Sequence, residues 1–173
     1  PRPRMDRRRD PTTGVSSFHL TVLARNYTGY RNLVELCSTS YVDGFYYNPR
    51  IDKDVLAAKH EGLLVLSGCF KGETSYLLRT GRRDLAYESA AWYRDLLGEN
   101  YFVEIQRNGT EGQDENNAEL LRLAEDLKIP VVCTNDVHYL DSGDALSQEI
   151  RMAISTGKTV EDDRRLKHRT EDF

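Results

Sequence analysis

Residues 129–139 read IPVVCTNDVHY, a mostly apolar run that passes directly into a polar one. The run IPVVCT, residues 129–134, is short and continuous, which is typical of a buried β-strand. Beyond it, Asp136 and His138 alternate with apolar neighbours, so in extended chain both side chains project to the same side. A carboxylate and an imidazole two residues apart form a good pair of metal ligands. The stretch therefore predicts a strand with a candidate site beyond its carboxyl end.

The rest of the chain alternates short apolar runs with segments of helical periodicity. Further strands are predicted at 18–24 (FHLTVLA), 63–66 (LLVL) and 101–106 (YFVEIQ). Helices are predicted from an N-cap at Thr28, and then at 52–60, 73–79, 84–97, 114–127 and 141–156. The stripe that should bury the first of these helices comprises Tyr30, Leu33, Val34, Cys37 and Tyr41.

This order of elements indicates the fold class. Strands that alternate with helices favour an α/β domain, with about four parallel strands joined by right-handed crossover helices. Four strands are too few to close a barrel of the usual eight. The segment is therefore expected to form either an open sheet or part of a barrel.

Charge and hydropathy exclude two classes of protein. The formal net charge of −4 over 173 residues excludes a chain that binds DNA through its overall charge. Basic residues gather in the segment 1–17, which we expect to be a solvated surface loop, with a phosphate-contacting arm as the alternative. No apolar run reaches the roughly 18 residues of a transmembrane helix, and no signal peptide is visible. We therefore expect a cytoplasmic protein without a membrane partner.

The cysteines indicate a reducing compartment. Cys37, Cys69 and Cys133 are odd in number and widely spaced, which argues against a disulfide framework. Each is expected to be a buried thiol that packs as a small hydrophobic group.

Other strand ends also carry candidate ligands. In parallel α/β folds, functional sites gather at the carboxyl ends of the strands. Cys69 follows the strand 63–66, Glu73 lies just beyond it, and Glu104 lies within the strand 101–106. A thiolate there could complete a metal site with Asp136 and His138.

Taken together, these motifs resemble the PHP (polymerase and histidinol phosphatase) domain of the bacterial DNA polymerase III alpha subunit. The matching runs are FHLTVLARN (18–26), TGYRNL (28–33), GFYY (44–47), PRID (49–52), GLLVLSGC (62–69) with Gly72-Glu73, TNDVHY (134–139) and TGKT (156–159). They occur in the family's order and spacing. The resemblance covers residues 18–173, which are interpreted as the C-terminal part of a PHP domain.

The resemblance implies a fold and a metal site. The family fold is a distorted α/β barrel of seven strands with zinc or manganese at one mouth, so this chain is expected to be a partial barrel. The family's metal ligands fall here on His19, Cys69, Asp136 and His138. His19 lies near the start of its strand, where the strand-end rule places no ligand, and is assigned from the resemblance alone.

The resemblance also implies an activity, 3′–5′ removal of a misincorporated nucleotide from DNA. In that reaction Asp136 and His138 are the candidate catalytic residues. Glu73 and Glu104 are weaker candidates, for hydrogen bonding to a ligand or for general base work.

The parent protein is expected to be a DNA-directed DNA polymerase, a nucleotidyltransferase that binds primer–template DNA and other replisome subunits. The family's opening strands, with an HxH motif, are missing from the sequence, and the palm with its magnesium would follow Phe173. The segment alone is therefore expected to be inactive. Two alternatives stay open: a non-catalytic PHP scaffold and a free-standing PHP phosphoesterase.

Overall fold

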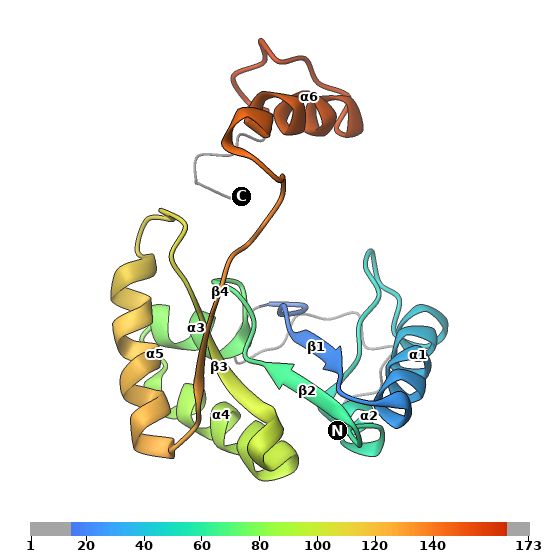
Figure 1. The fold of residues 1–173 in the computed structure, drawn as a ribbon, viewed down its shortest axis with the longest axis vertical. Coiled ribbons are helices and arrows are strands. Elements are labelled where there is room, and N and C mark those ends of the chain that lie inside the picture. Colours follow the sequence, from blue (N-terminus) through green and yellow to red (C-terminus); the bar gives the residue numbers. More distant parts are fainter. Residues whose placement is uncertain (1–14, 166–173) are drawn as a thin grey trace.

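The structure is a computed structural model that describes residues 15–165. It is a mixed α/β fold built on a four-stranded sheet (Figure 1). The strands, in their order across the sheet, are β1 (Thr21–Ala24), β2 (Leu63–Leu66), β3 (Tyr101–Gln106) and β4 (Val131–Thr134). The helices are α1 (Tyr27–Val42), α2 (Lys53–Ala58), α3 (Glu73–Arg79), α4 (Arg83–Leu97), α5 (Gln113–Leu127) and α6 (Ala145–Ser155), with short 3-10 turns η1 (Gly98–Asn100) and η2 (Ser142–Asp144).

The elements predicted from periodicity are present, although several are shorter than expected. The expected strand 18–24 is regular only from Thr21, and the expected helix 141–156 divides into η2 and α6. The basic segment 1–17 lies outside the described residues as far as residue 14. Within the described part of the chain, no helix is long and apolar enough to cross a bilayer.

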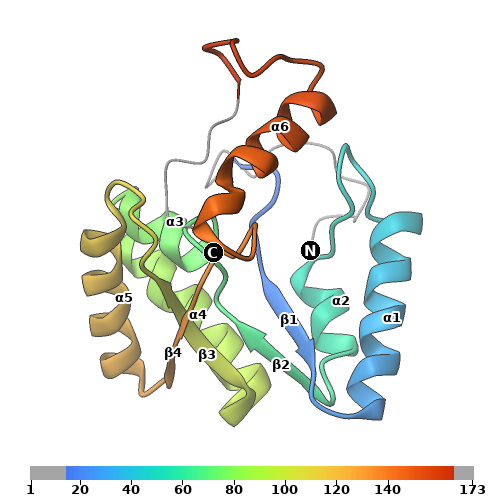
Figure 2. The same ribbon diagram turned by 45° about the horizontal axis from the view of Figure 1, so that its top comes forward.

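Three of the strands are parallel, as predicted, but β1 is not. β2 pairs with β3 and β3 with β4 in parallel, whereas β1 pairs with β2 in antiparallel register, Thr21 opposite Leu66 and Ala24 opposite Leu63. Figure 2 shows the reason: α1 leads away from the edge at which β1 ends, and α2 brings the chain back to it. β2 therefore starts beside the end of β1 and must run in the opposite direction. The expectation of four parallel strands is wrong at this one pair.

The face of α1 that meets the sheet also differs from the prediction. The N-cap is Asn26, whose side chain accepts a hydrogen bond from Gly29 N, and not Thr28. The buried positions of α1 are Gly29, Leu36 and Ser40. The predicted stripe was wrong in most of its members: only Leu33 packs partly against the core, while Tyr30, Val34, Cys37 and Tyr41 are exposed.

Close backbone contact explains this orientation of α1. A Cβ placed on Gly29 would lie 1.8 Å from the carbonyl oxygen of Gly62, at the turn before β2. Only a face without a side chain can approach the backbone this closely, so the helix turns Gly29 inward and the tyrosines outward.

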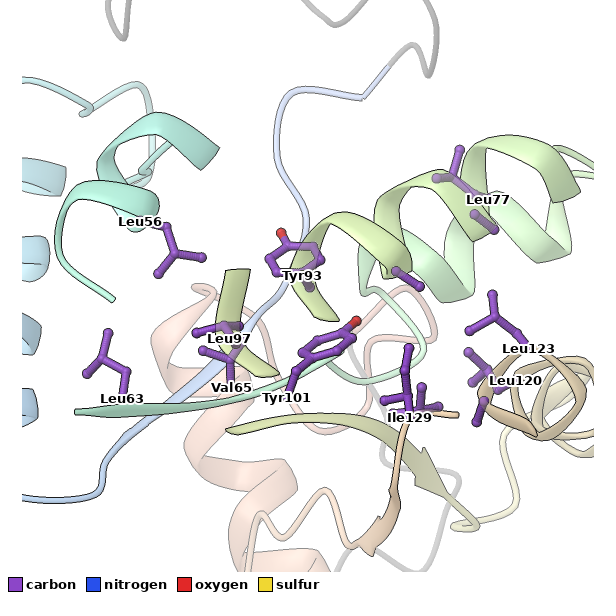
Figure 3. Close-up of a cluster of buried hydrophobic side chains, with 14 of the residues drawn as sticks. Leu56, Leu63, Val65, Leu77, Tyr93, Leu97, Tyr101, Leu120, Leu123 and Ile129 are labelled. Carbon is purple, nitrogen blue, oxygen red and sulfur yellow. The ribbon is translucent and has the colours of Figure 1, made fainter. Parts of the chain in front are cut away.

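The core lies against one side of the sheet and takes side chains from α1 and α2 as well as from α3, α4 and α5 (Figure 3). Alternation along β3 directs Tyr101 and Val103, both fully buried, toward these helices. Ile105 also packs against the core, whereas Glu104 and Gln106 face the open side of the sheet.

Two burial predictions were wrong. β4 is an edge of the described sheet and partly exposed, with Val131 40% accessible, and not the buried strand expected from its apolar run. Cys37 and Cys133 are exposed and Cys69 is half-buried, so the three cysteines are not the buried core thiols expected.

Replacing Gly29 with alanine should destabilise the fold, although alanine is the better helix former. The intrinsic helix preference would contribute about 1 kcal/mol of stability, but the new methyl group would overlap Gly62. We expect the free energy of unfolding to fall by about 2–3 kcal/mol, measured by urea denaturation of the chain. Gly143→Ala is the matched control because no atom lies within 4 Å of its Cβ position. Equal stability of the two variants would contradict this account of α1 packing.

Candidate metal centre

The open side of the sheet holds a pocket of about 610 Å³. It lies at the edge where β2, β3 and β4 end and β1 begins. Polar side chains in its lining include His19, Cys69, Glu104, Gln106, Thr134 and Asp136. No lysine or arginine is among the described residues that line the pocket. The lining is therefore suited to a cation and poorly suited to an anion on its own.

The antiparallel pairing of β1 brings His19 to this edge. Because β1 runs against β2, the residue just before β1 lies beside the loop that follows β2. His19 N donates to the carbonyl oxygen of Lys71 at 3.2 Å. Its ring nitrogen Nδ1 lies 3.5 Å from Cys69 Sγ. Thus His19, just before β1, lies in contact with Cys69, the candidate ligand that follows β2.

Glycine at position 68 makes this contact possible. Gly68 adopts a φ of +86°, and a Cβ there would lie 2.4 Å from the carbonyl oxygen of His19. A side chain would both strain the turn and push the strand start away. The sequence Ser67-Gly68-Cys69 therefore sets the distance between imidazole and thiol.

The environment of Cys69 favours the neutral thiol. Burial raises the pKa of Cys69 above its ordinary value, and the carboxylates of Asp136 and Glu104 raise it further. The backbone N–H of Lys71, 3.5 Å from Sγ, opposes these effects. A bound cation would remove the electrostatic penalty on the thiolate, because metal binding favours the deprotonated ligand.

Asp136 and His138 lie on the exposed segment that leads from β4 toward α6, which stands apart from the sheet in Figure 1. Asp136 lines the pocket, whereas His138 does not. His138 Nδ1 lies 2.6 Å from the backbone oxygen of Asp136. Of the four predicted ligands, the structure brings His19 and Cys69 into contact, adds Asp136 to the same pocket and leaves His138 outside it.

The donor chemistry fits a metal, but the described residues form an incomplete site. An imidazole nitrogen, a thiol sulfur and a carboxylate are ligands that zinc accepts, and the sulfur suits zinc better than manganese. Between residues 15 and 165, however, no group of three His, Cys, Asp or Glu side chains is placed so that it could hold an ion together.

The two glutamate candidates, Glu73 and Glu104, lie in different parts of the domain. Glu73 points to another part of the domain, where its carboxylate pairs with Lys53 Nζ at 3.1 Å and accepts a hydrogen bond from Tyr93. Glu104 is 5% exposed and lines the pocket floor. It accepts hydrogen bonds from Thr21 and Thr134, which sequence reasoning did not single out. Thr21 follows His19 by two residues and Thr134 precedes Asp136 by two residues. This spacing is the sequence feature that could have indicated the two threonines.

Comparisons with known proteins agree with the motifs. A family model of the PHP domain matches residues 4–108. DNA polymerase III subunit alpha of Deinococcus radiodurans is 44% identical over 170 residues, covering 98% of this chain and 13% of that protein. The subunits of Treponema pallidum (45% over 174 residues, 100% of this chain, 15% of that protein) and Thermus aquaticus (37% over 170 residues, 98% and 14%) are similar. The chain thus spans about one seventh of the length of these curated relatives.

Alkylation of the cysteines should reveal the raised pKa of Cys69 in metal-free protein. Iodoacetamide reacts with the thiolate, so a raised pKa moves the midpoint of the rate–pH profile to higher pH. We expect the midpoint for Cys69 in the folded protein to lie above that of Cys69 in urea-denatured protein, measured by mass spectrometry of the alkylated residue. Asp136→Asn removes a charge that raises the pKa and should shift the Cys69 midpoint of the folded protein back toward lower pH. Coincident midpoints for Cys69 in folded and denatured protein would contradict this description.

Proposed function

Because the chain belongs to the PHP domain family, we propose that it is the PHP portion of a DNA polymerase III alpha subunit that serves bacterial DNA replication. The observation that carries this proposal is the similarity of almost the whole chain to alpha subunits of several bacteria, at 44% and 45% identity in two of them. Residues 18–173 are the C-terminal part of the domain, and the described sheet is one part of a distorted barrel.

Within that protein, the domain is a metal-dependent 3′–5′ exonuclease that removes misincorporated nucleotides. His19, Cys69, Asp136 and His138 would hold zinc or manganese, together with ligands from the rest of the domain. Bound there, such an ion would supply a water molecule of lowered pKa and positive charge for the phosphate oxygens. The pocket supports this assignment, since without basic side chains among its described lining it needs a cation to accept a phosphodiester.

The residues themselves have distinct tasks. His19 would bind the ion through a ring nitrogen, and Cys69 would bind it as the thiolate, after loss of its proton. Asp136 is exposed and lines the pocket, and its carboxylate would offset part of the positive charge of the ion. His138 would have to turn away from the Asp136 backbone oxygen to reach the pocket.

Polymerisation belongs to other regions of the longer protein. A palm with magnesium catalyses nucleotide addition there, and primer–template DNA and other replisome subunits are partners of the whole protein. The segment alone is inactive as a polymerase.

A second candidate function is a non-catalytic scaffold. It is favoured by one observation: across residues 15–165, no three candidate ligands are close enough to bind an ion together. The two functions differ in metal content, which is the property to measure.

Asp136→Asn in the full-length protein should abolish metal-dependent removal of 3′ nucleotides and leave polymerisation unchanged, because the substitution removes a ligand charge but lies outside the palm. The measurement is degradation of a 3′-mismatched primer, alongside metal content by mass spectrometry, in protein purified without chelator.

Asp95→Asn is the control, since Asp95 is an exposed carboxylate on α4 that pairs with Arg94. Nuclease activity that survives Asp136→Asn would place the source of that activity elsewhere. A wild-type protein that binds no metal and degrades no primer would favour the scaffold.

A further inference from the structure

Building on the proposed metal site, we propose that Glu104 is a positioning residue that holds the chain segments of His19 and Asp136 at a fixed separation. Its carboxylate lies at the floor of the pocket and is 5% exposed. It accepts one hydrogen bond from β1 and one from β4, the two strands next to which these candidate ligands lie.

Each carboxylate oxygen of Glu104 receives a different hydroxyl. Thr21 Oγ1 donates to Oε2 at 3.1 Å, and Thr134 Oγ1 donates to Oε1 at 2.5 Å. Gln106 Nε2 adds a contact to Oε1 at 3.3 Å. A carboxylate has two acceptor oxygens and can satisfy both threonines at once, which links β1 to β4 across the intervening strands.

The backbone of Glu104 is fixed as well. Its N–H donates to the hydroxyl oxygen of Ser67 at 2.9 Å, and Ser67 is buried at the end of β2. Hydrogen bonds thus connect Glu104 to side chains at three other strands. A buried carboxylate with several donors has little freedom to rotate, so it can act as a rigid reference point.

The spacing along the chain transmits this position to the site. Thr21 follows His19 by two residues, and Thr134 precedes Asp136 by two residues. Only one residue separates each threonine from its candidate ligand, so a displacement of the threonine also displaces the ligand. Glu104 therefore acts on the site through these two neighbours, by fixing the positions of the chain segments that carry His19 and Asp136.

The test compares two substitutions at Thr134 in the full-length protein. Thr134→Val keeps the shape and removes the hydroxyl, whereas Thr134→Ser keeps the hydroxyl. We expect Thr134→Val to weaken zinc binding about tenfold, the lower end of the effect of losing a group that orients a metal ligand, and to alter the absorption spectrum of bound cobalt. Thr134→Ser should retain wild-type values. Glu104→Gln should behave like the valine variant, since an amide has only one acceptor oxygen.

Each result decides the inference. Unchanged zinc affinity and cobalt spectrum in both Thr134→Val and Glu104→Gln would overturn it. Thermal unfolding of every variant is the control for general destabilisation. A general loss of stability would lower the unfolding temperature of both Thr134→Ser and Thr134→Val, whether or not the hydroxyl is present.

A wild-type protein that binds no metal would refute the proposed metal-dependent activity, and the positioning role of Glu104 would then be tested by hydrogen–deuterium exchange. Faster exchange of residues 19–22 and 131–136 in Thr134→Val, but not in Thr134→Ser, would support the positioning role of Glu104. Equal exchange in all three proteins would refute it.

Discussion

The antiparallel pairing of β1 with β2 is the constraint on which the rest of the structure depends. It places the start of β1 and the end of β2 at the same edge, so His19 and Cys69 meet although 50 positions separate them. A parallel β1 would put His19 at the opposite edge, beyond the reach of Cys69. The pairing in turn requires that α1 and α2 return the chain to where β1 ended, with Gly29 against Gly62.

The two faces of the sheet differ in role: one packs the hydrophobic core, and the other carries the polar pocket. Alternation along β3 sends Tyr101 and Val103 into the core beneath α4 and α5, and Glu104 and Gln106 into the pocket. Burying a carboxylate is costly unless it is well hydrogen-bonded. Glu104 meets this condition through Thr21, Gln106 and Thr134, so the polar face is ordered before any ligand binds.

The pocket combines acidic side chains with a thiol that burial and neighbouring charges keep protonated. A cation bound in the pocket would stabilise the thiolate form of Cys69, because it would offset the negative charges of Asp136 and Glu104. Among the described residues, His19 and Cys69 are in contact and Asp136 lines the same pocket.

Hydrophobic periodicity alone was sufficient to predict the strands, most helices and the α/β class, because these depend on local spacing of apolar residues. The motifs predicted His19, Cys69, Asp136 and His138 as metal ligands, which stays a prediction; the first three line one pocket and His138 does not. The tertiary structure decided what depends on distant contacts: the direction of β1, the inward face of α1, the exposure of β4 and the hydrogen bonds of Glu104. Strand direction follows from where a crossover returns the chain, and a helix turns its glycine inward only where another backbone lies close by. Neither is encoded in the periodicity of any single segment.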